Sequence, residues 1–286
     1  MADKNTVFQQ KSTLNVRGRL LDLSEPKIMG ILNLTPDSFY DGGRNNNLNA
    51  ALKKTEQMLA DGADIIDIGA YSSRPGAVHI SEEEEQERMI PVIRAIIREF
   101  PETILSIDTF RSGIARASVQ EGAGIINDIS AGSLDGDMFK TIAEIKVPYI
   151  LMHMKGTPQN MAQNTDYENI TTDVCRYFAE KIAQLKAMGV QDLIIDPGFG
   201  FAKTLEQNYE LLSNLNALKI CGHPVLAAVS RKSMIYKLLN TDAEHALNGT
   251  TVLNTIALTK GANLLRVHDV KEAKEAIKII GQLKNS

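Results

Sequence analysis

Polar side chains follow directly after most of the short apolar runs in this sequence, and they are of types that bind ligands. The first run, 28–32, ends at Asn33 and leads into a segment rich in Pro, Asp and Gly that contains Asp37 and Asp41. Amide and carboxylate oxygens are ligands that Mg²⁺ prefers. The segment therefore indicates either a magnesium site at one end of a sheet or an ordinary loop between a strand and a helix.

The same pattern recurs at the ends of later apolar runs. The polar residues at or near those ends are Asp67, Asp108, Asn127, His153, Asp196, Lys232, Arg266 and His268. Burying such groups costs free energy unless they have partners, so their recurrence indicates one shared site. Each could instead be structural, and Asp67, which lies inside its run, could simply hold the adjacent loop at Arg74.

The polar types match the edges of a flat heterocycle. The carboxylates of Asp108 and Asp196 can only accept hydrogen bonds, whereas the amide of Asn127 donates and accepts. Together they can bind an edge that presents several donors. Lys232 can donate to a carbonyl or a ring nitrogen on the opposite edge.

A phosphate group is the second ligand that these residues favour. Arg266 and His268, with Asn33, can hold phosphate oxygens, and an arginine also stacks on flat rings. There is no Ser-His-Asp order, no HExxH and no Walker sequence. The stretch PGFGFAKT (197–204) lacks the full dinucleotide fingerprint, and we interpret it as a turn and a pocket wall.

Strands that alternate with helices must position these residues. Apolar runs of strand length occur at 28–32, 65–68, 104–107, 124–126, 148–152, 193–195, 225–229 and 263–265. Helical patterns separate them, and the acidic stretch SEEEEQ (81–86) is more typical of a solvated helix start than of a metal cluster. Eight such units in about 250 residues predict a single α/β domain, a closed (β/α)8 TIM barrel.

The N-terminal residues add a small element to this domain. Residues 1–12 are expected to be flexible, and residues 13–23 are expected to form a short β-hairpin that closes the bottom of the barrel. We expect all 286 residues to belong to one domain, because no Pro/Gly/Ser-rich linker interrupts the rhythm of the units.

Composition excludes several other classes of protein. The net charge of −4 argues against a nucleic-acid partner, and no run approaches the ~20 apolar residues of a membrane span. Cys175 and Cys221 lie far apart in the sequence and in no CxxC pattern, which argues against a disulfide framework or a zinc site. We expect a cytoplasmic protein.

The motifs in their order resemble those of the dihydropteroate synthases, folate-pathway enzymes among the pterin-binding barrels. The resemblance runs from about Ile28 to the C-terminus. The matching segments are NLTPDSFYDGG (33–43), SSRPG (72–76), SIDTFR (106–111), IINDISAG (125–132), DPGFGFAKT (196–204), SRKS (230–233) and RVHDV (266–270). One segment departs: before Arg-Pro-Gly the family usually has Gly-Glu-Ser-Thr, and here Tyr71 stands in place of the glutamate.

The resemblance implies a reaction and a set of roles. The family condenses 6-hydroxymethyl-7,8-dihydropterin diphosphate with 4-aminobenzoate, releases pyrophosphate with the help of Mg²⁺, and is a target of sulfonamides. By resemblance, the pterin would be held by Asp108, Asn127, Met152, Asp196, Lys232 and Arg266. The diphosphate would be held by Asn33, Ser73, Arg266 and His268. Catalysis would rest on Asp108, Lys232 and Asn33.

The same resemblance implies roles for two loops and for an oligomer. The loops after the first two strands would shape the aminobenzoate pocket, for which the candidates are Phe39, Ser73, Arg74, Pro75, Phe201 and Ser233. The candidate metal ligands are Asn33, Asp37 and Asp41. Members of the family are usually homodimers through their late helices.

Rival functions remain open from the sequence. A methyltransferase of the same barrel type would move a methyl group from a methylated folate to a corrinoid protein. It would share the pterin-holding Asp and Asn but would need no diphosphate site. A degenerate barrel could also bind a pterin without turnover, and an unrelated phosphate-binding barrel is a further possibility.

Overall fold

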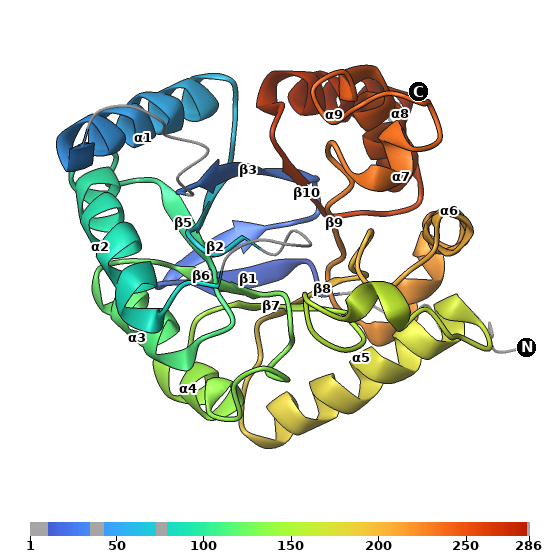
Figure 1. The fold of residues 1–286 in the computed structure, drawn as a ribbon, viewed down its shortest axis with the longest axis horizontal. Coiled ribbons are helices and arrows are strands. Elements are labelled where there is room, and N and C mark those ends of the chain that lie inside the picture. The colour runs from blue at the N-terminus through green and yellow to red at the C-terminus, as the bar shows by residue number, and fades with distance from the viewer. Residues whose placement is uncertain (1–10, 35–42, 73–78, 285–286) are drawn as a thin grey trace, which may run out of the picture.

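The computed structural model describes residues 11–34, 43–72 and 79–284. Eight parallel strands form one sheet in the order β8-β7-β6-β5-β4-β3-β10-β9. An isolated parallel bridge between Ile195 and Val225 joins the two ends of this order. The sheet is therefore closed into the predicted barrel, and helices surround it (Figure 1).

The strands lie close to the predicted runs. Their bounds are β3 (Lys27–Asn33), β4 (Ile65–Gly69), β5 (Ile104–Asp108), β6 (Ile125–Asp128), β7 (Tyr149–Met152), β8 (Leu193–Asp196), β9 (Leu226–Ala227) and β10 (Leu264–Val267). β9 is shorter than the predicted run 225–229. The chain turns directly after it, where the backbone N–H of Lys232 donates to the carbonyl of Val229 at 3.2 Å.

The helices follow the strands in the order expected of a (β/α)8 barrel. The α-helices are α1 (Gly43–Ala60), α2 (Glu82–Glu99), α3 (Ser112–Gln120), α4 (Met138–Ile145), α5 (Ile170–Ala187), α6 (Leu205–Ser213), α7 (Ser233–Tyr236), α8 (Leu247–Thr259) and α9 (Val270–Lys284). Two 3-10 helices are η2 (Met161–Gln163) and η3 (Leu215–Cys221). Between α7 and α8, Asn240 has a φ of 52°, a left-handed conformation that interrupts the helical segment.

The acidic start of α2 is only partly solvated. The side chain of Ser81 caps the helix by accepting a hydrogen bond from the Glu84 backbone at 3.2 Å. Glu82, Glu83 and Glu84 are exposed, as predicted. Glu85 is fully buried and forms an ion pair with Arg111, so that one glutamate belongs to the interior.

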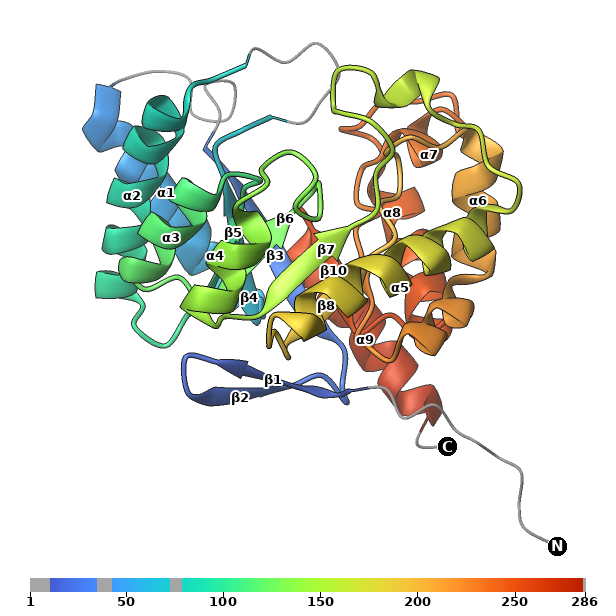
Figure 2. The same cartoon turned by 90° about the horizontal axis from the view of Figure 1, so that it is seen from below.

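The N-terminal hairpin covers one end of the barrel, as predicted. β1 (Thr13–Val16) and β2 (Arg19–Asp22) pair in antiparallel fashion across a turn in which Arg17 and Gly18 both have positive φ, as a type I′ turn requires. Figure 2 shows the hairpin lying across the end of the barrel opposite the loops that leave the strands. The barrel interior is thereby closed to water at its bottom.

The hairpin seals an apolar layer inside the barrel. Every barrel strand contributes to this layer, namely Met29, Ile65, Ile104, Ile125, Ile150, Ile194, Leu226 and Leu264. Leu14 from β1 packs in the same cluster and is fully buried. Successive side chains of a strand point to opposite faces, so the residue two positions after each of these also points into the barrel.

We predict that the hairpin stabilises the barrel through Leu14. Replacing a fully buried leucine by alanine removes apolar contacts and leaves a cavity, so Leu14→Ala should lower the free energy of unfolding by about 2–5 kcal/mol. Leu20 lies in the same hairpin but is 77% exposed, so Leu20→Ala should change it by no more than about 0.5 kcal/mol. Urea unfolding measures the free energy of unfolding of both variants. If Leu14→Ala lowered it no more than Leu20→Ala does, the hairpin would not be part of the core.

Candidate active site

The upper interior of the barrel is polar because of the alternation of side chains along the strands. Two positions after the apolar layer, the inward residues of β4, β6, β8 and β10 are Asp67, Asn127, Asp196 and Arg266. In β5 the polar residue Asp108 lies four positions after Ile104, which keeps it on the same face. These side chains are thus gathered at the carboxyl ends of the strands.

Arg266 joins two carboxylates in this layer. Its Nε lies 2.6 Å from Oδ2 of Asp67, and its Nη2 lies 2.6 Å from Oδ2 of Asp108. The side chain of Asp67 is fully buried, while those of Arg266 and Asp108 are 18% and 20% exposed. A guanidinium that donates to both carboxylates through two of its nitrogens fixes them relative to one another, and they fix it in turn.

Asp67 has more partners than the sequence indicated. It also accepts a hydrogen bond from Nδ2 of Asn127 at 3.1 Å, in addition to the bond from Arg266. Its other oxygen, Oδ1, is buried without a hydrogen-bond partner in the structure. Asp67 was also predicted to hold the loop at Arg74, and Arg74 lies outside the described residues. The structure gives Asp67 a different task, because it orients Arg266 and Asn127.

Asp67 and Asp108 share the guanidinium of Arg266, and this arrangement affects the pKa of Asp108. Burial raises the pKa of Asp108 to about 7, and the negative charge of Asp67 adds to this rise while Arg266 opposes it. A carboxyl group with this pKa changes its charge near neutral pH. The charge of Asp108 therefore responds to any charge that develops nearby.

Asp196 and Lys232 influence one another electrostatically at the mouth of the barrel. Burial raises the pKa of Asp196, and the positive charge of Lys232 is the largest influence that opposes this. Burial lowers the pKa of Lys232 to about 8, with Asp196 opposing. Arg266 acts on both pKa values, so the three side chains lie within electrostatic reach of one another. Asp196 also accepts a hydrogen bond from the backbone of Gly198 at 2.8 Å.

The loop after β8 brings its backbone close to the cavity. The φ of Gly198 is +69°, and a Cβ there would lie 2.1 Å from the carbonyl oxygen of His153, so only glycine fits. Lys232 donates to the carbonyl of Phe199, and its Nζ lies 4.7 Å from the centre of the Phe201 ring. The predicted pocket wall at 197–204 therefore contacts the lysine directly.

Lys203 is a residue of this loop that the sequence did not single out. Its buried Nζ donates to the carbonyls of Gly198 and Phe201 at 2.9 and 3.0 Å, and it lies 3.0 Å from Nδ1 of His153. Burial lowers the pKa of His153 to about 2, with Lys203 adding to the effect. His153 is therefore a neutral ring that contacts the lysine of this loop. In the sequence, only the lysine of the FAKT motif pointed to this contact.

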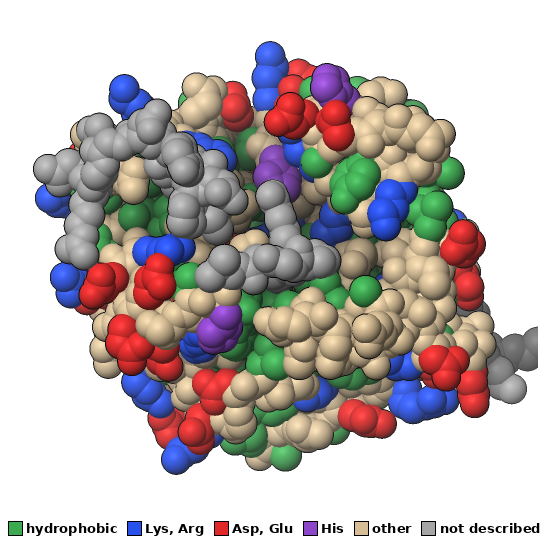
Figure 3. Space-filling model, in the orientation of Figure 1, with side chains coloured by type: hydrophobic (Ala, Val, Ile, Leu, Met, Phe, Trp, Pro, Cys, Tyr) green, Lys and Arg blue, Asp and Glu red, His purple; other side chains and the backbone are tan. Residues whose placement is uncertain are grey.

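His268 lies beside the arginine and contacts Ser230. Its Nδ1 is 3.0 Å from the hydroxyl of Ser230, which also accepts a hydrogen bond from the His268 backbone at 3.2 Å. Burial lowers the pKa of His268 to about 4, and the positive charge of Arg266 contributes. The ring is thus neutral at pH 7. Figure 3 shows Lys, Arg and His side chains beside a hollow near the centre of this face.

An apolar wall lies between two of these polar groups, because β7 is placed between β6 with Asn127 and β8 with Asp196. Met152, at the end of β7, is buried in a cluster with Ile129, Met154, Met161 and Ala202. Phe110, Leu134 and Phe201 pack against this cluster and are partly buried. The cavity therefore combines polar edges with an apolar side, as a flat aromatic ligand requires.

The remaining predicted residues divide into two groups. Asn33 ends β3 on the inward face and is half-buried, and Ser233 begins α7 directly after Lys232. The other predicted residues lie outside the described residues: Asp37, Phe39, Asp41, Ser73, Arg74 and Pro75. Within the described part of the chain, no group of three or more His, Cys, Asp or Glu side chains could hold a metal ion.

Comparisons with known proteins show which family the chain matches. A family model described as pterin binding enzyme matches residues 29–268. The dihydropteroate synthase of Escherichia coli (strain K12) is 45% identical over 269 residues, which cover 93% of this chain and 95% of that protein. The dihydropteroate synthase of Streptococcus pyogenes serotype M18 is 43% identical over 270 residues, which cover 93% and 98%.

Solved structures share the fold over almost the full length. The Yersinia pestis dihydropteroate synthase in complex with a sulfonamide drug has a TM-score of 0.90 and 43% identity, and the match covers 96% of this chain and 100% of that chain. The Xanthomonas albilineans dihydropteroate synthase in complex with 7,8-dihydropteroate has a TM-score of 0.86 and 36% identity, with 96% and 99% covered.

The raised pKa of Asp108 predicts a pH-dependent stability. Because Asp108 binds its proton more tightly in the folded protein, the stability it contributes is fully present below about pH 4 and is lost as the pH rises to about 7. Asp108→Asn cannot lose a proton. Its free energy of unfolding, relative to the wild type, should therefore rise from about pH 4 to 7 and level off above that.

Urea unfolding at fixed pH values measures this difference. Asp166→Asn is the matched control, because Asp166 is exposed and the same substitution there removes a solvated carboxylate. A difference between Asp108→Asn and the wild type that stays flat, or falls, over this range would contradict the assigned pKa.

Proposed function

Because this chain belongs to the pterin binding enzymes and has the activity of a dihydropteroate synthase, we propose that its barrel mouth holds the pterin ring at the base and the diphosphate above it. The enzyme joins 6-hydroxymethyl-7,8-dihydropterin diphosphate to 4-aminobenzoate and releases pyrophosphate, a step of folate biosynthesis. The observation that carries the proposed site is the layer formed by Asp67, Asp108 and Arg266 with Asn127 and Asp196 close by.

The pterin would be bound by its two edges and one face. Asp196 and Asn127 would accept and donate at the amino edge, and Lys232 would donate to the carbonyl edge. The guanidinium of Arg266 would cover one face, and Met152 would form the wall on the apolar side. The burial of Asp196 and Asn127, and the position of Met152 in the apolar wall, support this arrangement.

The diphosphate would lie toward the open side of the mouth. Arg266 and His268 would donate to its oxygens, with Asn33 and Ser73 as further donors. The Ser230 hydroxyl would donate to Nδ1 of His268, which leaves a proton on Nε2 for a phosphate oxygen. The position of His268 beside Arg266 supports this role.

The difficult step of the reaction is breaking the bond between the pterin methylene carbon and oxygen. The amine of 4-aminobenzoate is neutral at pH 7 and needs no strong base, so it attacks the methylene carbon as the pyrophosphate leaves with the electron pair. Positive charge spreads into the pterin ring during this step. That charge lowers the pKa of Asp108 and favours its ionised form, which in turn stabilises the ring. The amine proton is then lost to solvent.

Asn33 fits a magnesium ion that is carried mainly by the diphosphate. Its amide oxygen is a suitable ligand, and Mg²⁺ is commonly bound by one or two protein groups together with substrate phosphates and water. Asp37 and Asp41 remain proposed ligands. When bound, Mg²⁺ would neutralise the charge of the departing pyrophosphate.

The 4-aminobenzoate would bind on the outer side of the pterin. Phe201 and Ser233 are the candidates among the described residues, and the contact of Lys232 with the Phe201 ring supports their nearness to the site. Phe39, Ser73, Arg74 and Pro75 remain candidates from the sequence. The Yersinia pestis relative was solved with a sulfonamide drug, which supports sulfonamide binding at this pocket here.

The pterin site predicts the effect of Asp196→Asn. The substitution replaces an acceptor by a donor and leaves pterin donors unpaired, so the free energy of binding 6-hydroxymethyl-7,8-dihydropterin diphosphate should weaken by about 2–5 kcal/mol. Calorimetry measures binding, and pyrophosphate release with both substrates, with Mg²⁺ and with a chelator, measures turnover. Asp137→Asn, at an exposed position, is the control.

Two outcomes would contradict this account. Unchanged affinity in Asp196→Asn would remove Asp196 from the pterin site. A wild-type protein that releases no pyrophosphate in the presence of Mg²⁺ and both substrates would favour a pterin-binding barrel without turnover. A methyltransferase is disfavoured by relatives that are dihydropteroate synthases over most of their length.

A homodimer through the late helices is also part of this proposal. α8 and α9 pack on one another and expose apolar side chains at helical spacing, Val252 with Ile256 and Ile279 with Leu283. Ile279 is 64% exposed, and burying such side chains favours association.

No helix among the described residues is long and apolar enough to cross a membrane. A cytoplasmic location is proposed, and two free cysteines support it.

The dimer proposal predicts a change of mass in solution. Placing a charge at the centre of the exposed apolar strip should prevent association, so Ile279→Asp should sediment as a monomer while the wild type sediments as a dimer. Leu20→Asp, at an exposed apolar position of the hairpin, should leave the dimer intact. A wild type that is monomeric, or an Ile279→Asp variant that remains dimeric, would contradict this interface.

A further inference from the structure

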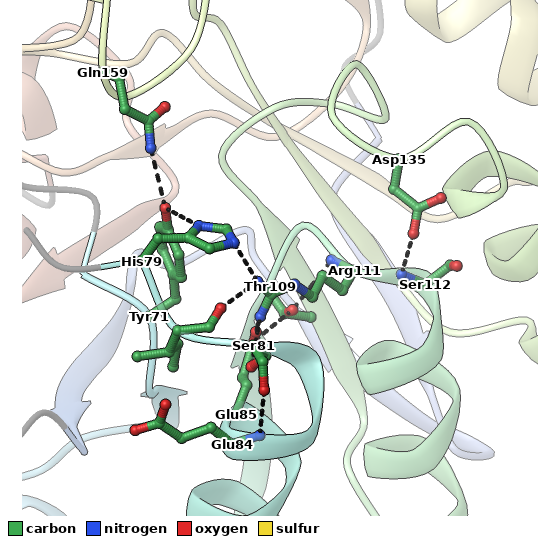
Figure 4. A network of polar contacts seen from close by, with 11 residues as sticks. Tyr71, His79, Ser81, Glu84, Glu85, Thr109, Arg111, Ser112, Asp135 and Gln159 are labelled. Carbon is green, nitrogen blue, oxygen red and sulfur yellow. Dashed lines mark hydrogen bonds and ion pairs between the residues drawn. The ribbon is translucent and has the colours of Figure 1, made fainter.

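Tyr71 connects loops that leave three different strands of the barrel. It lies two residues after β4, and its hydroxyl is 3.3 Å from Nδ1 of His79, further along the same loop. Nε2 of Gln159, in the loop after β7, donates to the same hydroxyl at 3.3 Å. Figure 4 shows Tyr71 between these two side chains, with the Arg111 group beyond His79.

The ring of Tyr71 contacts the loop after β5. It meets Phe110 edge to face, with ring centroids 5.0 Å apart and an angle of 90° between the planes. Phe110 in turn packs against the apolar wall that contains Met152 and Met161, where Phe201 also packs. The position of Tyr71 is therefore coupled to the apolar side of the cavity.

The other end of this group of contacts is firmly anchored. Arg111 forms an ion pair with the fully buried Glu85 and donates to the carbonyl of Ile80 at 2.6 Å. Thr109, directly after Asp108, donates to Glu85 at 2.7 Å. Nη2 of Arg111 lies 3.4 Å from Nε2 of His79, which links the anchor to the partner of Tyr71.

We propose that Tyr71 is a positioning residue for the 4-aminobenzoate side of the site, an inference that rests on the proposed function. Arg111 can only donate to Nε2 of His79, so Nδ1 of His79 carries the ring proton. Tyr71 therefore accepts at its hydroxyl oxygen from both His79 and Gln159. Its ring meanwhile supports Phe110. Tyr71 thus holds the loops after β4, β5 and β7 at one spacing around the apolar wall.

The pterin edges should be independent of this contact. The hydrogen bonds of Asp196 and Lys232 run to Gly198 and Phe199 in the loop after β8, and not to Tyr71, His79 or Gln159. Loss of the Tyr71 hydroxyl should consequently alter the binding of the aryl amine and not the binding of the pterin.

The test is Tyr71→Phe, which keeps the ring and removes the hydroxyl. We expect the KM for 4-aminobenzoate to rise about three- to tenfold, as the loss of a neutral hydrogen bond predicts, while kcat changes by less than about twofold. The Kd for 6-hydroxymethyl-7,8-dihydropterin diphosphate should change by less than about twofold. Thr259→Val is the control, because it removes a hydroxyl that donates at 2.8 Å to the carbonyl of Ile256 on the outer helix α8, away from the residues proposed for the site.

A double variant adds a second readout. Gln159→Leu removes the other partner of the hydroxyl, so its effect on the KM should not add to that of Tyr71→Phe. An unchanged KM in Tyr71→Phe, or equal losses in kcat and pterin affinity, would overturn the inference. Fully additive effects of the two substitutions would also overturn it. A wild-type enzyme that releases no pyrophosphate would instead defeat the proposed function.

Discussion

The ion pairs of Arg266 with Asp67 and Asp108 are the constraint on which the rest of the site depends. Arg266 extends from β10 across β3 to carboxylates on β4 and β5, so it links strands that are not direct neighbours in the sheet. Buried charges of this kind are stable only when each is paired. Two carboxyl groups that share one guanidinium carry a negative charge in excess whenever Asp108 is ionised, which suits a ligand whose ring becomes positive during reaction.

This arrangement needs a barrel that is dry and closed below. The apolar layer that begins at Met29 and Ile65 fills the lower interior, and the hairpin covers it with Leu14. Because side chains alternate along each strand, the strands themselves supply the polar residues of the next layer, and no loop residue is needed there. The chain therefore places Asp67, Asp108 and Arg266 on strands, while the loops after β4, β5 and β7 are joined through the contacts of Tyr71.

Most of the fold could be predicted from the sequence because apolar runs of strand length alternate with helical patterns. The strand ends at Asn127, Asp196 and Arg266 could be predicted for the same reason, since a polar residue after an apolar run is visible in one dimension. The task of Asp67 was less accessible. Its partner Arg266 is almost 200 residues away, and only the alternation from Ile65 to Asp67 indicated that it points inward.

Other features depended on contacts that no local pattern contains. Glu85 looks like one of four solvated glutamates, yet it is buried because Arg111 arrives from a different loop. Cys175 and Cys221 are distant in sequence, but Cys221 lies near enough to Cys175 to lower the pKa of the Cys175 thiol. Tyr71 could be recognised as a departure from the family, but its partners could not.

The most direct measurement is a crystal structure of the enzyme with 6-hydroxymethyl-7,8-dihydropterin diphosphate bound. The account predicts that Arg266 still bridges Asp67 and Asp108 and covers one face of the pterin, with Asn127 and Asp196 in hydrogen-bond contact with its amino edge. A pterin bound elsewhere on the barrel, or a pterin at the mouth with Asp196 and Arg266 turned away from it, would contradict the central claim.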